Sequence, residues 1–198
     1  MVTQTQVIGM TTGIVIAAAG RSERFIRAGG SGNKLNAPLG ERTLFARTLQ
    51  QAQDSGLPLV VVTRPDNQHV RRHCAEQQVE TVLLDSHGLG DSIAAGVAAR
   101  PQWDGWLIHL ADMPFVPPDI FRQTAAALQQ HAIVRPCVNG RPGHPVGFSA
   151  ALRNALCALH GDDGGRSVLF GREVHLISVD NPAIVMDIDL PSQLADNE

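Results

Sequence analysis

Short apolar runs alternate along this chain with segments of helical periodicity, and this alternation restricts the possible folds more than any other feature. The apolar runs predict strands at 13–19, 58–63, 79–84, 104–111, 132–138 and 174–179. The other segments predict helices at 42–55, 66–77, 91–99, 117–131, 150–158 and 164–171. Strands separated by helices pair in parallel, because each helix carries the chain back across the sheet. We therefore expect one α/β domain with a mostly parallel sheet between two helical layers.

Composition narrows the class of protein further. A chain of 198 residues without an internal repeat or linker suits a single domain that buries roughly 70% of its unfolded surface. The net charge of −3 is not the excess of positive charge that is typical of proteins that bind nucleic acid or anionic membranes. No apolar run is long enough to span a bilayer. Three scattered cysteines favour a reducing, cytoplasmic setting. Residues 1–12 are expected to form a flexible leader before the domain at 13–198.

The first apolar run ends in a turn of small residues, which suits close contact with phosphate groups. Ala18, Ala19 and Gly20 leave their main-chain N–H groups uncovered, and the cations Arg24 and Lys34 follow. The loop is neither a P-loop, which needs Ser or Thr after the lysine, nor a dinucleotide fingerprint, which needs a third glycine. A flexible surface loop would have a similar composition, so this alternative stays open.

Three carboxylates follow two other apolar runs and are candidate metal ligands. Asp112 ends the run at 104–111, and Asp187 and Asp189 lie two residues apart after another apolar run. Side chains two apart in an extended segment point to the same side, so this pair could share a cation with Asp112. Two of the three have a structural alternative, since Asp112 could cap the turn before Pro114 and Asp189 could begin a last helix.

Ser92 stands near the start of the helix predicted at 91–99. Its hydroxyl and the helix N-terminus could hold a ribose or a phosphate group. The alternative is that Ser92 caps this helix, a role for which Asp91 competes.

Six motifs occur in the same order as in a known family. They are Ala18-Ala-Gly-Arg-Ser-Glu-Arg24 with Lys34 and Pro38-Leu-Gly40, Gly90-Asp-Ser-Ile-Ala-Ala-Gly96, Leu110-Ala-Asp-Met-Pro114, Gly140-Arg-Pro-Gly-His-Pro-Val146, Gly161-Asp-Asp-Gly-Gly-Arg166 and Asp187-Ile-Asp-Leu-Pro191. With them the chain resembles the molybdenum-cofactor nucleotidyltransferases, and most of all the molybdopterin cytidylyltransferases. The resemblance implies a Rossmann-like nucleotidyltransferase fold, a MobA-like NTP transferase domain, over 13–198.

The first motif departs from the family pattern. In relatives the first arginine is usually followed by Met-Gly and the lysine comes within a few residues, whereas Phe25 to Asn33 intervene here and add a further cation, Arg27. Either Lys34 or Arg27 could therefore contact the phosphates. We favour Lys34, because the family pattern resumes directly after it.

The resemblance also implies an activity. The enzyme would transfer CMP from CTP to the terminal phosphate of molybdopterin and release pyrophosphate, with Mg²⁺ as cofactor and a molybdenum hydroxylase as possible recipient of the product. The expected roles are catalytic for Arg24, Lys34 and Asp112, metal-binding for Asp112, Asp187 and Asp189, nucleotide-binding for Ala18, Ala19, Gly20 and Ser92, and pterin-binding for Arg141 and His144.

Other activities stay open at this point. Side-chain identity does not separate CTP from GTP, because bases are often read by main-chain groups. The acceptor could also be a sugar or alcohol phosphate. Asp187-Ile-Asp189 resembles the metal motif of nucleotide-sugar glycosyltransferases as well, and a non-catalytic pterin carrier is a further alternative.

Overall fold

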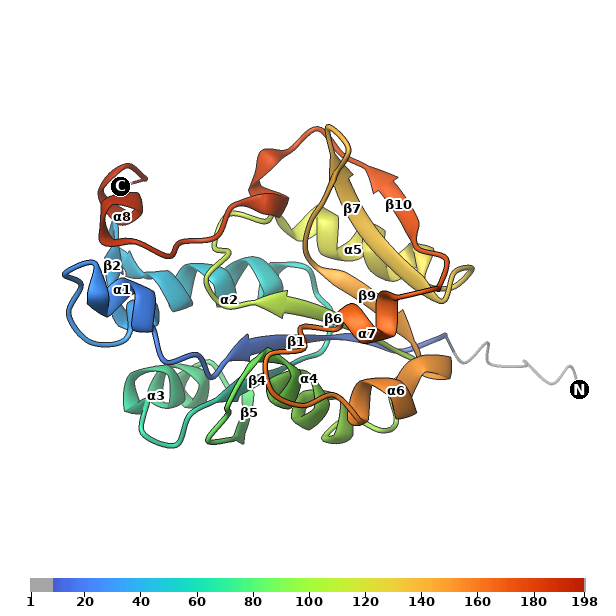
Figure 1. Ribbon diagram of the computed structural model, residues 1–198, viewed down its shortest axis with the longest axis horizontal. Helices are drawn as coiled ribbons and strands as arrows, with labels where there is room; N and C mark the ends of the chain where they lie inside the picture. The colour runs from blue at the N-terminus through green and yellow to red at the C-terminus, as the bar shows by residue number, and fades with distance from the viewer. Residues whose placement is uncertain (1–8, 198) are drawn as a thin grey trace, which may run out of the picture.

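The computed structural model describes residues 9–197. Residues 1–8 of the expected leader lie outside the described residues, and the first strand, β1, begins at Thr12. The central sheet runs in the order β10 (His175–Ser178), β7 (Ile133–Val138), β9 (Val146–Ser149), β6 (Gly105–Leu110), β1 (Thr12–Ala18), β4 (Leu59–Thr63) and β5 (Glu80–Leu83), with β8 (Arg141–Pro142) paired to β7. Figure 1 shows α2 and α5 on one side of the central strands β1 and β6, and α4 and α6 on the other.

The mostly parallel sheet is confirmed. Strand β1 pairs in parallel with both β4 and β6, and β10 pairs in parallel with β7. The exception within the sheet order is β9, which is antiparallel to β6 and β7. All of the strands expected from the sequence are present, whereas β9 was not expected. It is only four residues long and follows a segment rich in Gly and Pro, which predicts turns rather than a strand.

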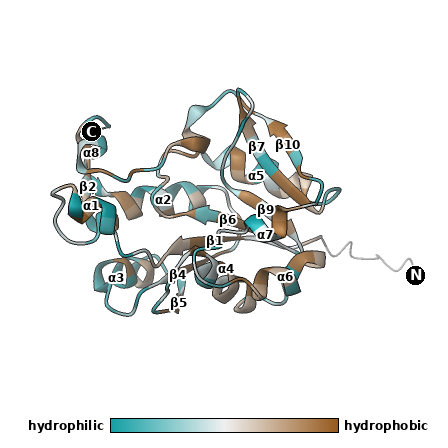
Figure 2. Ribbon diagram, viewed as in Figure 1, coloured by the Kyte–Doolittle hydropathy of each residue, from teal (hydrophilic) through white to brown (hydrophobic). Residues whose placement is uncertain are grey.

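Helices cover both faces of the sheet. This is expected, because successive apolar side chains of β1 point to opposite faces and each face must be covered. Ile14 and Ile16 of β1 pack into the core on one face and Val15 into the core on the other. The first core includes α2 (Leu44–Asp54), α3 (Gln68–Glu76) and α5 (Pro118–Ala127), and the second includes α4 (Leu89–Ala98), α6 (Arg153–Cys157) and α7 (Arg166–Leu169). Figure 2 shows hydrophobic residues concentrated along the central strands. The expected three layers are therefore present.

The remaining elements are short. They are α1 (Glu23–Arg27), α8 (Pro191–Ala195), the hairpin strands β2 (Pro38–Leu39) and β3 (Arg42–Thr43), and the 3₁₀ turns η1 (Lys34–Asn36), η2 (Ala150–Leu152) and η3 (Pro182–Val185). The helix expected at 150–158 consists of η2 followed by α6. No helix within residues 9–197 has the length and apolar character needed to cross a membrane.

Two features of the fold position a ligand site. The chain leaves β1 toward β4 and β5 and then returns to β6 on the other side of β1, so the carboxyl ends of β1 and β6 form a topological switch point. Helix α4 packs tightly against this part of the sheet, because a Cβ at Gly96 would lie 2.3 Å from Val15 Cγ1. The N-terminus of α4 is thereby held beside the end of β1.

Candidate active site

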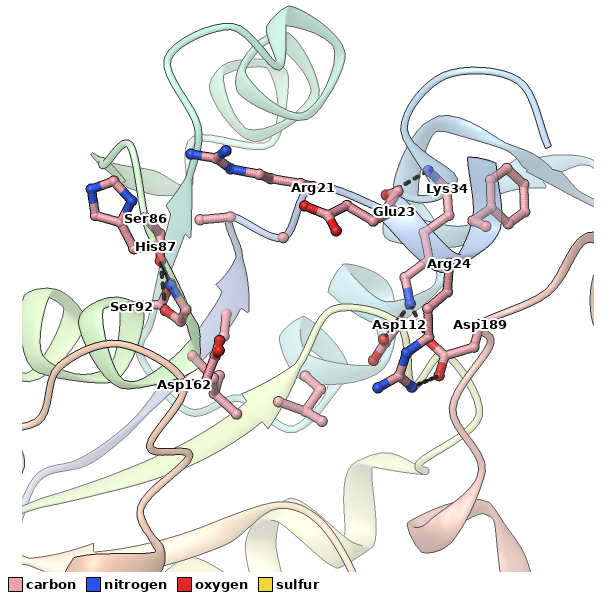
Figure 3. A pocket seen from close by; sticks show the side chains of 18 of the residues that line it. Arg21, Glu23, Arg24, Lys34, Ser86, His87, Ser92, Asp112, Asp162 and Asp189 are labelled. Carbon is pink, nitrogen blue, oxygen red and sulfur yellow. Dashed lines mark hydrogen bonds and ion pairs between the residues drawn. The ribbon is translucent and has the colours of Figure 1, made fainter. Parts of the chain in front are cut away.

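A cleft of about 530 Å³ opens at the carboxyl ends of β1 and β6. Its lining includes seven residues that the sequence singled out, namely Ala19, Gly20, Arg24, Lys34, Ser92, Asp112 and Asp189. These residues come from the loop after β1, from α1, η1 and α4, from the end of β6 and from the segment before α8. Figure 3 shows Arg24, Lys34, Asp112 and Asp189 gathered on one side of the cleft, with Ser86 and Ser92 opposite.

Local hydrogen bonds fix the lengthened loop that carries Lys34. Ser22 adopts a left-handed conformation, with φ of 58°, and its Oγ accepts from the main-chain N–H of Lys34 at 3.0 Å. Asn33 closes the base of the loop, because its Nδ2 donates to the carbonyl of Gly20 at 3.3 Å. The inserted residues fold onto Phe25, since a Cβ at Gly30 would lie 2.3 Å from that ring. The insertion thus forms a compact loop.

Lys34 lies between two carboxylates. Its Nζ donates to Asp112 Oδ2 and to Asp189 Oδ1, both at 2.7 Å. Arg24 Nη1 donates to the other oxygen of Asp189 at 3.0 Å. The main-chain carbonyl of Asp112 also accepts from the N–H of Ile188 at 2.9 Å, which holds the segment bearing Asp189 beside the end of β6. Two segments distant in sequence therefore form one charged cluster.

Burial and pairing act against each other on the ionisation of this cluster. Burial favours neutral Lys34, but the charges of Asp112 and Asp189 outweigh it and raise the pKa of the ammonium group. Burial raises the pKa of Asp112 despite the nearby Lys34. Burial acts in the same direction on the less buried Asp189, but hydrogen bonding and charge from Lys34, aided by Arg24, lower its pKa. Lys34 is consequently a fixed positive charge rather than a proton acceptor.

The carboxylates also form a group that could hold a divalent cation. One oxygen from each of Asp112, Asp187 and Asp189 lies within 4.8 Å of the others. Oδ1 of Asp112 is buried, and no donor among the described residues reaches it. An unpaired buried carboxylate oxygen beside two further carboxylates matches the oxygen ligands that Mg²⁺ and Mn²⁺ prefer. The donor set therefore fits a hard divalent ion.

Arg27 occupies a different place from Lys34. It lies on α1 and its Nη2 pairs with Glu23 Oε2 at 3.1 Å, one helical turn away. Both side chains are largely exposed, although Arg27 does border the cleft. The structure thus brings Lys34, and not Arg27, into contact with Asp112 and Asp189.

The opposite wall is formed around the N-terminus of α4. Ser92 Oγ donates to Ser86 Oγ at 3.1 Å, and Ser86 Oγ donates to the carbonyl of Gly88 at 2.6 Å. Asp91 accepts from the N–H groups of His87 and Gly161, both at 2.9 Å, so it secures this turn. Ser86, His87 and Asp162 border the cleft and were not singled out as site residues. The turn signal at Ser86-His-Gly-Leu-Gly90, just before Ser92, could have indicated the first two.

Four candidate residues lie outside the lining of the cleft. Ala18 is buried at the end of β1, where its carbonyl accepts from Thr63 Oγ1. Asp187 is exposed on the outer side of the carboxylate group, and Arg141 is exposed on β8. His144, between β8 and β9, is partly buried and its main-chain N–H donates to the carbonyl of Ile184. Burial, with charge from His109 and Arg135, lowers the pKa of His144 to about 3, so its imidazole is neutral.

Comparison with known proteins connects this site to a family. The model of the MobA-like NTP transferase domain matches residues 14–176. Rv0371c from Mycobacterium tuberculosis is 26% identical, with a TM-score of 0.82 over 95% of this chain and 97% of that one. A second structure of Rv0371c, with a TM-score of 0.74, is a complex with manganese. No curated protein matches the chain.

More distant structures share the fold. Mth528 from Methanothermobacter, described as a nucleotidyl transferase, is 23% identical, with a TM-score of 0.79 over 96% of this chain and 97% of that one. The 4-diphosphocytidyl-2C-methyl-D-erythritol synthase of Anaerococcus prevotii is 15% identical, with a TM-score of 0.74 over 95% and 94%. At these identities the likeness concerns the architecture, which matches the α/β fold described above.

Proposed function

The chain belongs to the MobA-like NTP transferase family, and from this premise we propose that it transfers CMP from CTP to the terminal phosphate of molybdopterin. Nucleotidyl transfer is the chemistry that the family indicates. The observation that carries the proposal is the cluster in which Lys34 and Arg24 meet Asp112 and Asp189 at the mouth of a small-residue loop. Positive charge for phosphates and carboxylates for a cation thus occur side by side.

The nucleotide would occupy the cleft beside β1. Ala19 and Gly20 place main chain without bulky side chains at its edge, so phosphate oxygens can approach closely. Arg24 and Lys34 would neutralise the triphosphate and the departing pyrophosphate. Asp112, Asp189 and Asp187 would hold Mg²⁺. When bound, such an ion supplies further neutralisation of phosphate oxygens and orients them.

The reaction itself needs no general base in this proposal. An oxygen of the molybdopterin phosphate attacks the α-phosphorus of CTP, and the bond from that phosphorus to the bridging oxygen breaks, which releases pyrophosphate. The attacking phosphate is already mostly ionised at neutral pH, because its second pKa is about 6. This agrees with a cluster in which Lys34 keeps its proton and acts through charge.

The assignment is tested by pyrophosphate release with molybdopterin, Mg²⁺ and each of CTP, GTP, ATP and UTP. We expect pyrophosphate release with CTP to be at least about tenfold faster than with each of the other nucleotides. A factor of this size corresponds to one well-placed hydrogen bond to the base. Preference for GTP would indicate guanylyl transfer, and release only with a sugar or alcohol phosphate would change the acceptor. Pterin binding without release would indicate a carrier, and reaction only with a nucleotide sugar would indicate a glycosyltransferase.

The acceptor is proposed to contact Arg141 and His144. Because β9 is the neighbour of β6, the residues that precede β9 lie near the strand end that carries Asp112. We expect His144→Ala to weaken molybdopterin binding about ten- to a hundredfold and to spare CTP, while Arg24→Ala does the reverse. Separate calorimetric titrations with CTP and with molybdopterin measure the two affinities. Weaker CTP binding by His144→Ala, with pterin binding unchanged, would show that the acceptor assignment is wrong.

A further inference from the structure

A second, larger cleft lies outside the carboxylate cluster. It has a volume of about 750 Å³ and lies between the loop that follows β1 and the start of α3. Its lining combines arginines with amide side chains: Arg21, Arg64, Arg72, Asn33, Asn36 and Asn67. Arg21 borders both clefts, and Figure 3 shows its side chain extending away from Lys34 and the carboxylates. The second cleft is therefore a neighbour of the active site with its own polar lining.

Two amide side chains that border this cleft each have a buried polar atom without a partner. Asn67 is 6% exposed, and its Oδ1 caps α3 by accepting from the N–H of Val70 at 3.2 Å. Its Nδ2 is buried and has no acceptor among the described residues. Oδ1 of Asn36, which borders the same cleft, is likewise buried and without a donor. Buried donors and acceptors are nearly always paired, so these two atoms point to a molecule that supplies both an acceptor and a donor.

The charges favour an anion. Arg64 donates through Nε to Asp66 at 3.1 Å and its Nη1 lies 2.8 Å from Asp85, which is also 3.5 Å from Arg21. These two acids offset two of the three arginines. Arg72 makes no ion pair within residues 9–197, so its charge is not offset there. The N-terminus of α3, a helix of nine residues, adds its dipole to this surplus of positive charge.

We propose that this cleft binds a phosphate group, either as inorganic phosphate or as the phosphate of a small hydroxylated ester. Phosphate oxygens would accept from Asn67 Nδ2, from Arg72 and from the main-chain N–H of His69, since the N–H groups of Gln68 and Val70 already donate within the protein. A hydroxyl of the phosphate or of its ester would donate to Asn36 Oδ1. This site is separate from the nucleotide site, because it uses neither Lys34 nor the three carboxylates.

The site is tested by titrating the ¹⁵N-labelled chain with inorganic phosphate and with ribose 5-phosphate in NMR. We expect saturable shifts of the Asn67 side-chain amide and of the His69 main-chain amide. Tighter binding of ribose 5-phosphate would identify an ester as the ligand, and equal binding would identify phosphate itself. Lys34→Ala should leave these shifts unchanged, which keeps this test independent of the proposed nucleotidyl transfer.

Two substitutions and a matched control decide the assignment. Asn67→Asp keeps an oxygen to cap α3 but replaces the donor by a negative charge, and Arg72→Gln removes the unpaired cation. We expect each to weaken phosphate binding at least about tenfold. Arg71→Gln removes the same charge from a neighbouring residue that donates to the carbonyl of Pro65 and does not border the cleft, so it should change little. Equal losses in Arg71→Gln and Arg72→Gln, or shifts confined to the Lys34 cleft, would overturn the proposal.

Discussion

Asp112→Asn is expected to lower the rate of nucleotidyl transfer by about a hundredfold or more while leaving the fold intact. The substitution keeps the shape of the side chain and an oxygen that can accept from Lys34, but it removes the charge that would hold a cation at the end of β6. Losing one preorganised electrostatic group at a reacting centre costs about 10²–10³ in turnover. Steady-state pyrophosphate release with saturating CTP measures the loss.

Stability provides the control for Asp112→Asn. Burial raises the pKa of Asp112, so its ionised form is disfavoured in the folded protein relative to the unfolded chain. A neutral amide relieves this cost at pH values above that pKa, but it also leaves the buried ammonium group of Lys34 with Asp189 as its remaining charged partner in the cluster, so we expect these two effects to offset and the melting temperature to stay close to that of the wild type. Asp187→Asn, on the exposed edge of the same group, should have a milder effect on turnover. Near-normal turnover of Asp112→Asn would rule out Asp112 as a ligand.

The regular part of the fold could be predicted because its determinants are local. The strand from Thr12 to Ala18 and its neighbours are apolar runs, and the turns after them contain Gly, Pro or Asp. Strand β9 could not be predicted, since Val146–Ser149 is short and its antiparallel pairing with β6 and β7 depends on residues far away in the chain. Tertiary pairing decided its structure rather than its own sequence.

The site shows a similar division. Asp112 follows an apolar run that forms β6, and its place at the carboxyl end of the sheet could be expected from the sequence. The apolar residues before Asp189 instead belong to the 3₁₀ turn η3 and the irregular segment after it, so Asp189 does not lie at a strand end. The bond from Ile188 to the carbonyl of Asp112, which holds the second segment in place, has no signature in the sequence. The position of His144, partly buried between β8 and β9, also depends on distant contacts, here with Ile184.

The inserted loop illustrates why sequence spacing alone leaves the choice of cation open. Arg27 and Lys34 both follow Arg24 in this loop, and the folding of the insertion onto Phe25 gives them different positions. The chain then returns toward the start of the loop, where Ser22 Oγ accepts from the main-chain N–H of Lys34 and donates to Asn33 Oδ1. These two hydrogen bonds hold Lys34 at the end of the loop. Arg27 meanwhile remains on α1, paired with Glu23. The insertion therefore increases the number of residues between Arg24 and Lys34, but Lys34 still contacts Asp112 and Asp189.

Lys34→Ala is consequently expected to lower turnover by about a hundredfold, and Arg27→Ala by no more than about threefold. Each substitution removes one positive charge from the same loop, but only Lys34 donates to Asp112 and Asp189 at 2.7 Å, and charge-assisted contacts at a reacting centre are the ones whose loss is large. Exposed pairs such as Arg27 with Glu23 contribute little. Initial rates of pyrophosphate release compare the two variants directly.

A second measurement on Lys34→Ala separates its electrostatic role from a role in folding. Without the ammonium group, the carboxylates of Asp112, Asp187 and Asp189 repel one another within 4.8 Å, so the melting temperature should fall in the absence of a divalent ion. Mg²⁺ or Mn²⁺ should then raise it by more than in the wild type, because the ion no longer competes with Lys34 for the same oxygens. Arg27→Ala should show the wild-type response. If Arg27→Ala instead loses more activity than Lys34→Ala, the lengthened loop has transferred the phosphate contact to the arginine.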